Sequence, residues 1–318
     1  MPEAETVGEF DWIARLLRPL TRGDPAALDL LDDVAVLPSR PGRDLILTKD
    51  ALVEGVHYLP DDPLDLVARK LLRVNLSDLA AKGAEPLGYL LMTAWPAGAG
   101  WAEREAFVAG LAEDGARYGL TLLGGDTVVT PGPATFSATL LGWVPAGEAI
   151  LRQGARPGDL LAVSGTIGDG WLGLLAARGE LGDPEGRLTA AYRLPEPRLD
   201  LRQTLRTHAR AAADVSDGLL ADAGHIATAS GCAVSIDLDQ TPLSDAARAW
   251  LATQPDAAGG HLALASGGDD YQIVCALAPE AEVPTGLSVV GRFTAGAGVT
   301  VRFAGKPLAT ARLGWTHD

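Results

Sequence analysis

Short apolar runs alternate along the chain with longer stretches in which apolar residues recur every three or four positions. The first pattern is typical of strands, and the second of helices that bury one face. In the first half, the predicted strands lie at residues 34–37, 44–50, 89–95, 120–123 and 135–144. The predicted helices of this half lie at residues 64–82 and 102–118. This alternation predicts a mixed fold of the α/β (α+β) class.

The segment Pro145–Asp159 separates two strand-like runs and is rich in glycine and proline. Because such punctuation marks a connection, we predict a domain boundary there, with domains at residues 1–147 and 148–318. In the second domain, the predicted strands lie at residues 160–164, 234–238, 271–277, 288–292 and 299–303. The predicted helices lie at residues 169–178 and 217–230, and a Gly- and Pro-rich excursion that runs to Pro197 follows the first of them.

Composition narrows the class of protein. Of the 318 residues, 47% are hydrophobic and 21% are charged, which suits a large buried core and excludes disordered chains and disulfide-framed miniproteins. The net charge of −15 disfavours nucleic acid and anionic membranes as partners. The sequence has neither a signal-peptide pattern nor an apolar run near the roughly 20 residues of a membrane span, so we expect a cytoplasmic location. Cys232 and Cys275 lack metal-ligand spacing, which makes thiol catalysis and zinc clusters poor candidates.

Aspartates among glycines and other small residues are the most informative pattern. They occur in seven segments, at residues 31–34, 48–50, 75–78, 124–127, 165–169, 214–218 and 267–271. Taken alone, each aspartate is explained by a turn or a helix N-cap. Together they indicate a different use, because Mg²⁺ takes oxygen ligands and bridges carboxylates to phosphate groups. Glycines before Asp126 and Asp269 let backbone N–H groups approach a phosphate, so a nucleotide is the expected ligand.

Of two common nucleotide-binding motifs, the sequence lacks one and contains a single match to the other. The P-loop pattern G-x-x-x-x-G-K-[ST] does not occur. Residues 168–173 match G-x-G-x-x-G after a predicted strand, but no second strand follows within the next ~20 residues, as a dinucleotide-binding unit requires. We therefore interpret these glycines as a tight turn that packs a helix on a sheet.

Helix geometry predicts where Asp78 points. At about 100° per residue, Asp78 lies opposite Arg69 and beside Asn75, so its carboxylate is expected to face protein and to find a partner there. The arginines of the two long helices are expected on solvated faces; these are Arg69, Arg73, Arg104 and Arg117.

These segments, in this order, resemble the thiamine-monophosphate kinase family of the aminoimidazole-ribonucleotide-synthetase-like superfamily. The matching segments are residues 8–10, 32–35, 50–58, 75–81, 124–127, 152 with 154–159, 214–219 and 266–271. The ordered set spans nearly the whole chain. The resemblance implies a two-domain fold of that superfamily, in which the sheet of the N-terminal, ATP- and Mg²⁺-binding domain forms the interface of a homodimer.

The resemblance also implies roles for individual residues. The implied Mg²⁺ ligands are Asp33, Thr48, Asp50, Asp78, Asp126 and Asp214, with Asp217 as a further metal position. The implied nucleotide contacts are Gly125, Asp126, Arg152, Ser216 and Tyr118. The implied contacts to the thiamine substrate are His57, Asp269 and Trp315. Asp50, Asp78, Asp126 and Arg152 are the residues expected to carry catalysis.

Two positions depart from the family pattern. Asp269 stands where a glutamate is typical, and Asp270 beside it could take the same part. Lys49 stands where a small hydroxyl residue is frequent, so its ammonium group is expected to replace some of the metal charge. The terminal run from Gly314 to His317 resembles the ending of the family and brings in Trp315 as an aromatic contact for a cationic thiazolium ring.

The implied reaction is transfer of the γ-phosphoryl group of ATP to thiamine monophosphate, with several Mg²⁺ ions. The acceptor phosphate has a second pKa near 6 and is largely ionised at neutral pH, so alignment and charge neutralisation are needed rather than a general base. The number of metal ions and a requirement for K⁺ stay open. Two alternatives also stay open: another ATP-dependent enzyme of the same superfamily, and a non-catalytic nucleotide-sensing protein.

Overall fold

The computed structural model describes residues 8–316 and contains two compact units. The first comprises the chain up to Leu79 together with Ala84–Gly147, and the second comprises Ala80–Gly83 together with the chain from Glu148 onward. Among the described residues, no helix combines the length and the apolar character that a membrane span requires.

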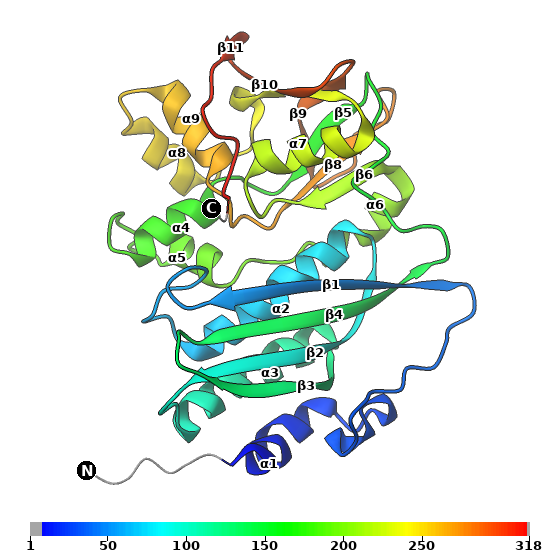
Figure 1. Cartoon of the computed structure of the whole chain (residues 1–318). Helices are drawn as coiled ribbons and strands as arrows, with labels where there is room; N and C mark the ends of the chain where they lie inside the picture. Colours follow the sequence, from blue (N-terminus) through cyan, green and yellow to red (C-terminus); the bar gives the residue numbers. More distant parts are fainter. Residues whose placement is uncertain (1–7, 317–318) are drawn as a thin grey trace. The chain divides into compact units, whose positions relative to one another are not determined.

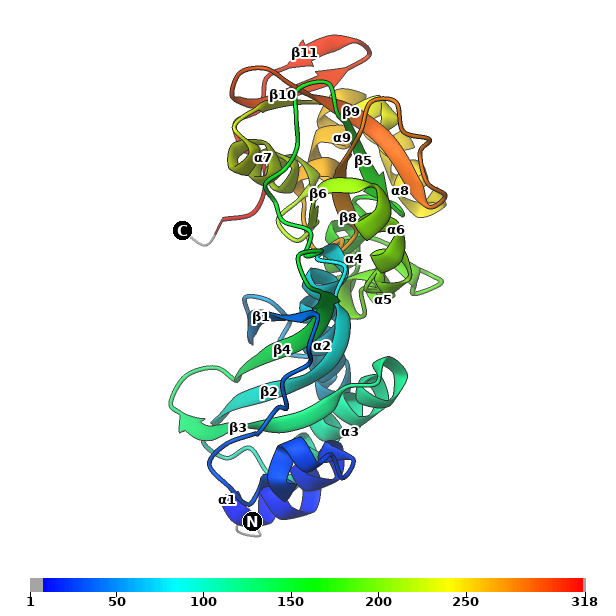
Figure 2. The same ribbon diagram turned by 90° about the vertical axis from the view of Figure 1, so that its right-hand side faces the viewer.

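The first unit is built on a four-stranded sheet in the order β1-β4-β2-β3. Its strands are β1 (Arg43–Val53), β2 (Glu85–Pro96), β3 (Thr121–Thr130) and β4 (Thr135–Pro145). Its helices are α1 (Glu9–Trp12), α2 (Leu64–Ala81) and α3 (Trp101–Tyr118), with the short turns η1 (Ile13–Leu17), η2 (Arg18–Thr21) and η3 (Pro25–Leu30). Figures 1 and 2 show α2 and α3 on one face of this sheet. β2 and β3 run parallel, because α3 connects them as a crossover, whereas β4 is antiparallel to both β1 and β2.

The arginines of α2 and α3 are mostly buried, so the prediction of solvated faces was wrong for three of the four. Arg73 is 3% exposed, and its Nε donates to the fully buried carboxylate of Asp114 on α3 at 2.6 Å. Arg69 donates to the same carboxylate at 3.2 Å. Arg104 is 6% exposed and lies against the rings of Trp12 and Trp95, and only Arg117 is exposed. The periodicity of one helix does not reveal an acidic partner on another helix.

The second unit contains a seven-stranded sheet in the order β11-β10-β7-β9-β5-β8-β6. Its strands are β5 (Leu160–Ser164), β6 (Ala209–Asp214), β7 (Ala233–Asp237), β8 (Ile273–Leu277), β9 (Leu287–Thr294), β10 (Gly298–Phe303) and β11 (Lys306–Leu308). Its helices are α4 (Asp169–Ala177), α5 (Arg187–Arg193), α6 (Arg202–His208), α7 (Leu219–Ser230), α8 (Asp245–Ala252) and α9 (Ala257–Ser266), with the turns η4 (Leu199–Leu201) and η5 (Leu238–Gln240).

Helices cover both faces of this second sheet, which explains why β5 is buried at every position and apolar at every position except its last residue, Ser164. Leu161 and Val163 belong to the same core as Ile226 of α7, whereas Leu160 belongs to a separate core with Leu205 of α6. Successive side chains of a strand point to opposite faces, so a strand buried on both sides reads as a continuous apolar run.

Two parts of the predicted secondary structure need correction. Residues 34–37 form no strand, and Val34 and Val36 are 57% and 58% exposed, because no neighbouring strand pairs with this segment in the structure. The strand predicted at 120–123 continues to Thr130 as β3, so the Gly124–Asp126 motif lies within a strand rather than after one. The excursion before Pro197 contains the short helix α5.

Candidate functional site

A pocket of about 260 Å³ lies in the first unit, beside the motif of β3. Asp33, Gly125 and Asp126 line it, together with residues of the N-terminal helical segments. The carboxylates of Asp33 and Asp126 are exposed, and Asp126 Oδ1 accepts a hydrogen bond from the N–H of Thr127 at 2.8 Å. Gly125 is required here, because a Cβ atom at this position would lie 1.8 Å from the carbonyl oxygen of Leu91. The pocket therefore combines carboxylates with closely packed strand backbone.

A second group of oxygen atoms joins β1 to α2. Thr48 Oγ1 donates to Asp78 Oδ2, and the N–H of Asp50 donates to Asn75 Oδ1 at 3.1 Å. The expectation that Asp78 faces protein is therefore confirmed. Burial and the nearby charge of Asp78 raise the pKa of Asp50 to about 7. The charge of Asp78 therefore disfavours ionisation of Asp50, and the nearby positive charge does not offset this effect.

Lys49 supplies part of the missing charge in this group. Its Nζ donates to Ser137 Oγ at 2.7 Å, and that hydroxyl in turn donates to the carbonyl oxygen of Asp50 at 2.9 Å. The Lys49 ammonium group lowers the pKa of Asp50, although burial and Asp78 outweigh it. Because successive side chains of a strand alternate, Lys49 and Asp50 project from opposite faces of β1.

The two acidic groups of the first unit lie at opposite edges of its sheet. The register aligns Asp50 with Ala138, Ala138 with Leu91, and Leu91 with Gly125. Three inter-strand steps separate β1 from β3, which corresponds to about 14 Å. Asp126 follows Gly125 and therefore projects from the face opposite to that of Asp50. Within one such unit, these two carboxylates cannot share a metal ion.

His57 lies in the turn after β1 and is held by hydrogen bonds. Its ring atom Nδ1 accepts from the backbone N–H of Val53 at 3.1 Å, and the backbone N–H of His57 donates to the carbonyl oxygen of Val53 at 2.9 Å. Lys70 Nζ donates to the carbonyl oxygen of His57 at 3.3 Å. Because Nδ1 is an acceptor, the proton of the neutral imidazole is on Nε2, which makes Nε2 a donor.

Tyr118 ends α3 and is not among the residues that line the pocket of the first unit. The guanidinium carbons of Arg73 and Arg117 lie 5.6 Å and 5.2 Å from the centroid of its ring. These contacts are typical of a cation–π arrangement and account for the position of the ring without a nucleotide.

In the second unit, backbone hydrogen bonds gather the predicted residues around the loop that follows β6. The N–H of Asp269 donates to the carbonyl oxygen of Ser216 at 2.8 Å, and the N–H of Trp315 donates to that of Asp217 at 2.9 Å. Asp214, the last residue of β6, is 4% exposed. Trp315 is 51% exposed, with the guanidinium carbon of Arg312 5.4 Å from its ring centroid. His317 lies outside the described residues.

Asp270, which the sequence offered as an alternative to Asp269 for contact with the thiamine substrate, is buried and hydrogen-bonded to backbone instead. It is 7% exposed, and its carboxylate accepts from the N–H of Gly168 at 2.9 Å and from that of Gly170 at 3.0 Å, at the start of α4. Burial raises its pKa to about 8. A Cβ atom at Gly173 would lie 2.0 Å from the carbonyl oxygen of Leu188 in α5. Gly168 has the positive φ of 96° that suits the predicted tight turn, and a Cβ atom at Gly170 would lie 2.1 Å from the carbonyl oxygen of Asp269 in a loop. The glycines of this motif therefore form a turn and allow close packing as predicted, but against neighbouring helices and a loop rather than against the sheet.

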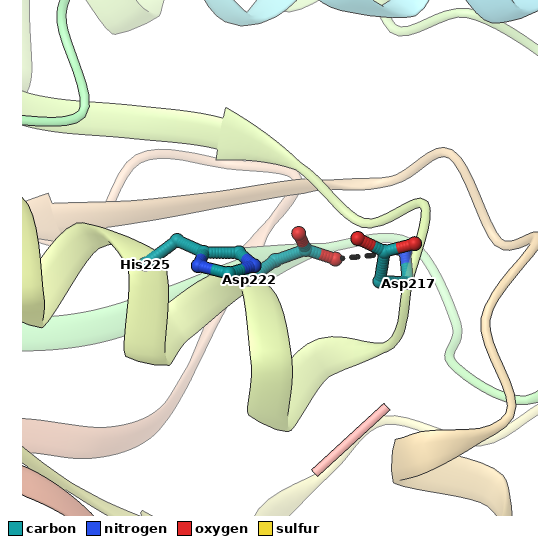
Figure 3. A group of neighbouring side chains, drawn as sticks. All are labelled: Asp217, Asp222 and His225. Carbon is teal, nitrogen blue, oxygen red and sulfur yellow. Dashed lines mark hydrogen bonds between the residues drawn. The ribbon is translucent and has the colours of Figure 1, made fainter. Parts of the chain in front are cut away.

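Two residues that sequence analysis did not select join Asp217. Asp222 and His225 of α7 each offer a possible ligand atom, and with Asp217 these atoms lie within 4.8 Å of one another (Figure 3). Burial and the charge of Asp217 raise the pKa of Asp222 to about 7, while Arg152, which is exposed, acts in the opposite direction. The available signal was the three-residue spacing of Asp222 and His225, which puts both side chains on one face of a helix.

Family models and curated relatives match this chain over most of its length. Residues 31–144 match the family described as AIR synthase related protein, N-terminal domain, and residues 156–304 match AIR synthase related protein, C-terminal domain. The thiamine-monophosphate kinase of Caulobacter vibrioides is 61% identical over an aligned length of 325 residues. The match covers 99% of this chain and 92% of that protein.

Solved structures extend this similarity to the fold. The thiamine-monophosphate kinase from Stenotrophomonas maltophilia K279a has a TM-score of 0.80 at 35% identity, and the similarity covers 95% of this chain and 98% of that one. AaThiL complexed with AMPPCP and TMP has a TM-score of 0.78 at 30% identity, with coverage of 99% and 100%.

Proposed function

Because the chain belongs to the thiamine-monophosphate kinase family, we propose that it transfers the γ-phosphoryl group of ATP to thiamine monophosphate, giving thiamine diphosphate and ADP. The observation that carries the proposal is the grouping of motif carboxylates, with Asp33 and Asp126 at one pocket and Asp50 and Asp78 in one cluster. The complex of the related AaThiL with AMPPCP and TMP supports the choice of both substrates.

The oxygen atoms of Thr48, Asp50 and Asp78 fit a hard divalent cation. The raised pKa of Asp50 reflects repulsion and burial that a bound cation would offset. We assign this cluster to Mg²⁺, and assign the remaining predicted ligands to further ions; these are Asp33, Asp126, Asp214 and Asp217. When bound, Mg²⁺ neutralises phosphate charge and reduces the repulsion between ATP and the acceptor phosphate.

The side chains of the protein align the acceptor phosphate with the γ-phosphoryl group of ATP. The acceptor oxygen is already ionised at neutral pH, so no residue needs to remove a proton from it. His57 donates from Nε2 to the phosphate of the thiamine substrate, because Nδ1 is engaged by Val53. Arg152 adds a positive charge for the nucleotide phosphates, and Ser216 is a further nucleotide contact. We also assign Tyr118, whose ring contacts two arginines, to the nucleotide.

The thiazolium end of the substrate is a cation and needs a complementary surface. Trp315 offers an indole ring that is half exposed, and Asp269 offers a carboxylate on the same loop cluster. An indole face and an acid together attract a cationic ring through cation–π and charge interactions. We assign these two residues to substrate recognition.

The proposed active form is a homodimer in which each site takes residues from two copies. Asp50 and Asp126 lie on opposite edges and faces of one sheet, so a single first unit cannot present both to one Mg²⁺–nucleotide. A second copy that brings its β3 edge to the β1 edge of the first would complete the set. We place this enzyme in the cytoplasm, where ATP is available as co-substrate.

Product chromatography tests the proposal. Purified protein is incubated with ATP and Mg²⁺ and with either thiamine or thiamine monophosphate. We expect thiamine diphosphate to form from the monophosphate only, and little product from a folded Asp126→Asn variant. ATP hydrolysis without a thiamine product would favour another enzyme of the superfamily, and nucleotide binding without any turnover would favour a sensor. Either result would refute the proposed reaction.

A further inference from the structure

Asp217, Asp222 and His225 meet at the start of α7, where their ligand atoms lie within 4.8 Å of one another. In Figure 3 the carboxylate of Asp222 lies between the imidazole ring of His225 and the carboxylate of Asp217. We infer that these side chains form a separate metal site, which binds a divalent first-row transition cation such as Zn²⁺ through two carboxylates and one imidazole nitrogen. The inference shares only Asp217 with the metal positions of the proposed function.

Asp222 provides the observation that points to a ligand. Its side chain is 1% exposed, and its Oδ2 accepts from the N–H of Asp217 at 3.1 Å and from that of Gly218 at 3.2 Å. Its Oδ1 is also buried, and no described residue gives it a hydrogen bond. A buried acceptor without a hydrogen bond destabilises the fold, and more so when it is charged. A cation held jointly with Asp217 and His225 would supply the missing partner.

Arg152 does not already fill that role. Its charge acts on Asp222 from a distance, but its guanidinium group donates no hydrogen bond to the buried Oδ1. Arg152 is itself exposed to solvent. The buried Oδ1 of Asp222 is therefore left for a metal ion to engage.

The donor atoms select the class of cation. Mg²⁺ and Ca²⁺ prefer oxygen ligands only, whereas imidazole nitrogen suits zinc and other transition ions. Zinc takes both imidazole nitrogen and carboxylate oxygen at about 2.0–2.2 Å, a distance that one ion can reach from three ligand atoms that lie within 4.8 Å of one another. His225 is exposed, so its ring can rotate to close the set while Asp222 stays fixed by the backbone of the loop.

Zinc binding to the full chain tests this inference. The protein is stripped of metal with a chelator, returned to excess Mg²⁺ to occupy all-oxygen sites, and titrated with Zn²⁺ against a chromogenic chelator. We expect His225→Gln to weaken Zn²⁺ binding by at least about tenfold, since even loss of an outer partner of a ligand costs 10–100-fold. His208→Gln is the matched control, because His208 is also exposed but lies at the end of α6. Imidazole ¹⁵N signals should shift on Zn²⁺ addition and disappear from the shifted set in His225→Gln.

Equal Zn²⁺ affinity in the wild type and His225→Gln would overturn the inference, as would complete displacement of Zn²⁺ by Mg²⁺. Asp222→Asn should weaken binding as well, but its carboxylate also holds the loop, so circular dichroism must show that the variant folds. His225→Gln keeps the test decisive, because it alters an exposed side chain. The assay contains neither nucleotide nor thiamine compound, so its failure is distinct from failure of the proposed kinase reaction.

Discussion

The separation of Asp50 and Asp126 by about 14 Å across the sheet predicts that two inactive variants restore each other's activity. Asp50→Asn and Asp126→Asn each remove one carboxylate from every site of a homodimer. Loss of one electrostatic contact to the reacting groups costs roughly 10²–10³ in rate, so each variant alone should be nearly inactive. The two changes lie at opposite edges of the first unit and should leave its fold intact.

Mixing the two variants should return about a quarter of the wild-type rate, because random pairing makes half the dimers mixed and each mixed dimer has one intact site of two. The assay measures thiamine diphosphate formed after coexpression or after subunit exchange. A mixture of Asp50→Asn with Asp78→Asn is the matched control, since both residues belong to one cluster and every site stays defective. If the first mixture is as inactive as its parents, the assignment of the two edges to different copies is refuted.

Three further predictions follow from single side chains. Asp269→Glu restores the residue typical of the family and should change the KM for the thiamine substrate more than that for ATP; equal effects in steady-state kinetics would count against a substrate contact. Asp114→Asn should lower the free energy of unfolding by about 3–5 kcal/mol, because it leaves the buried Arg73 without its anionic partner. The control is Glu113→Gln, whose side chain is 59% exposed and which should change the free energy of unfolding by less than about 1 kcal/mol. Denaturant titrations measure both values. Burial raises the pKa of Asp270 to about 8, so the folded chain keeps a proton that the unfolded chain releases above about pH 4. The free energy of unfolding should therefore fall as pH rises from about 5 to 8. Asp270→Asn should lack this contribution to the pH dependence when thermal unfolding is followed against pH.

Much of the local structure could be predicted from the order of residues. The predicted helices at 64–82 and 102–118 correspond to α2 and α3, and the strand predicted at 160–164 is β5. Such elements follow from a periodicity that spans only a few turns or residues. The family was also predicted correctly, because its motifs are short, contiguous and ordered along the chain. The site residues carried over from the family remain predictions for the experiments above.

Strand order and helix contacts were decided only by the tertiary structure. Asp50 and Asp126 look alike in sequence, yet the order β1-β4-β2-β3 sends them to opposite edges of the sheet. Periodicity placed Arg73 on a solvated face, but in the structure it pairs with Asp114 of α3. Sequence analysis did not select Asp222, whose buried Oδ1 has no hydrogen-bond donor among the residues that the structure describes. Periodicity reports which face of an element is apolar, because it depends on neighbours along the chain. Which partner meets that face depends on residues far away in sequence, and only the folded chain brings them together.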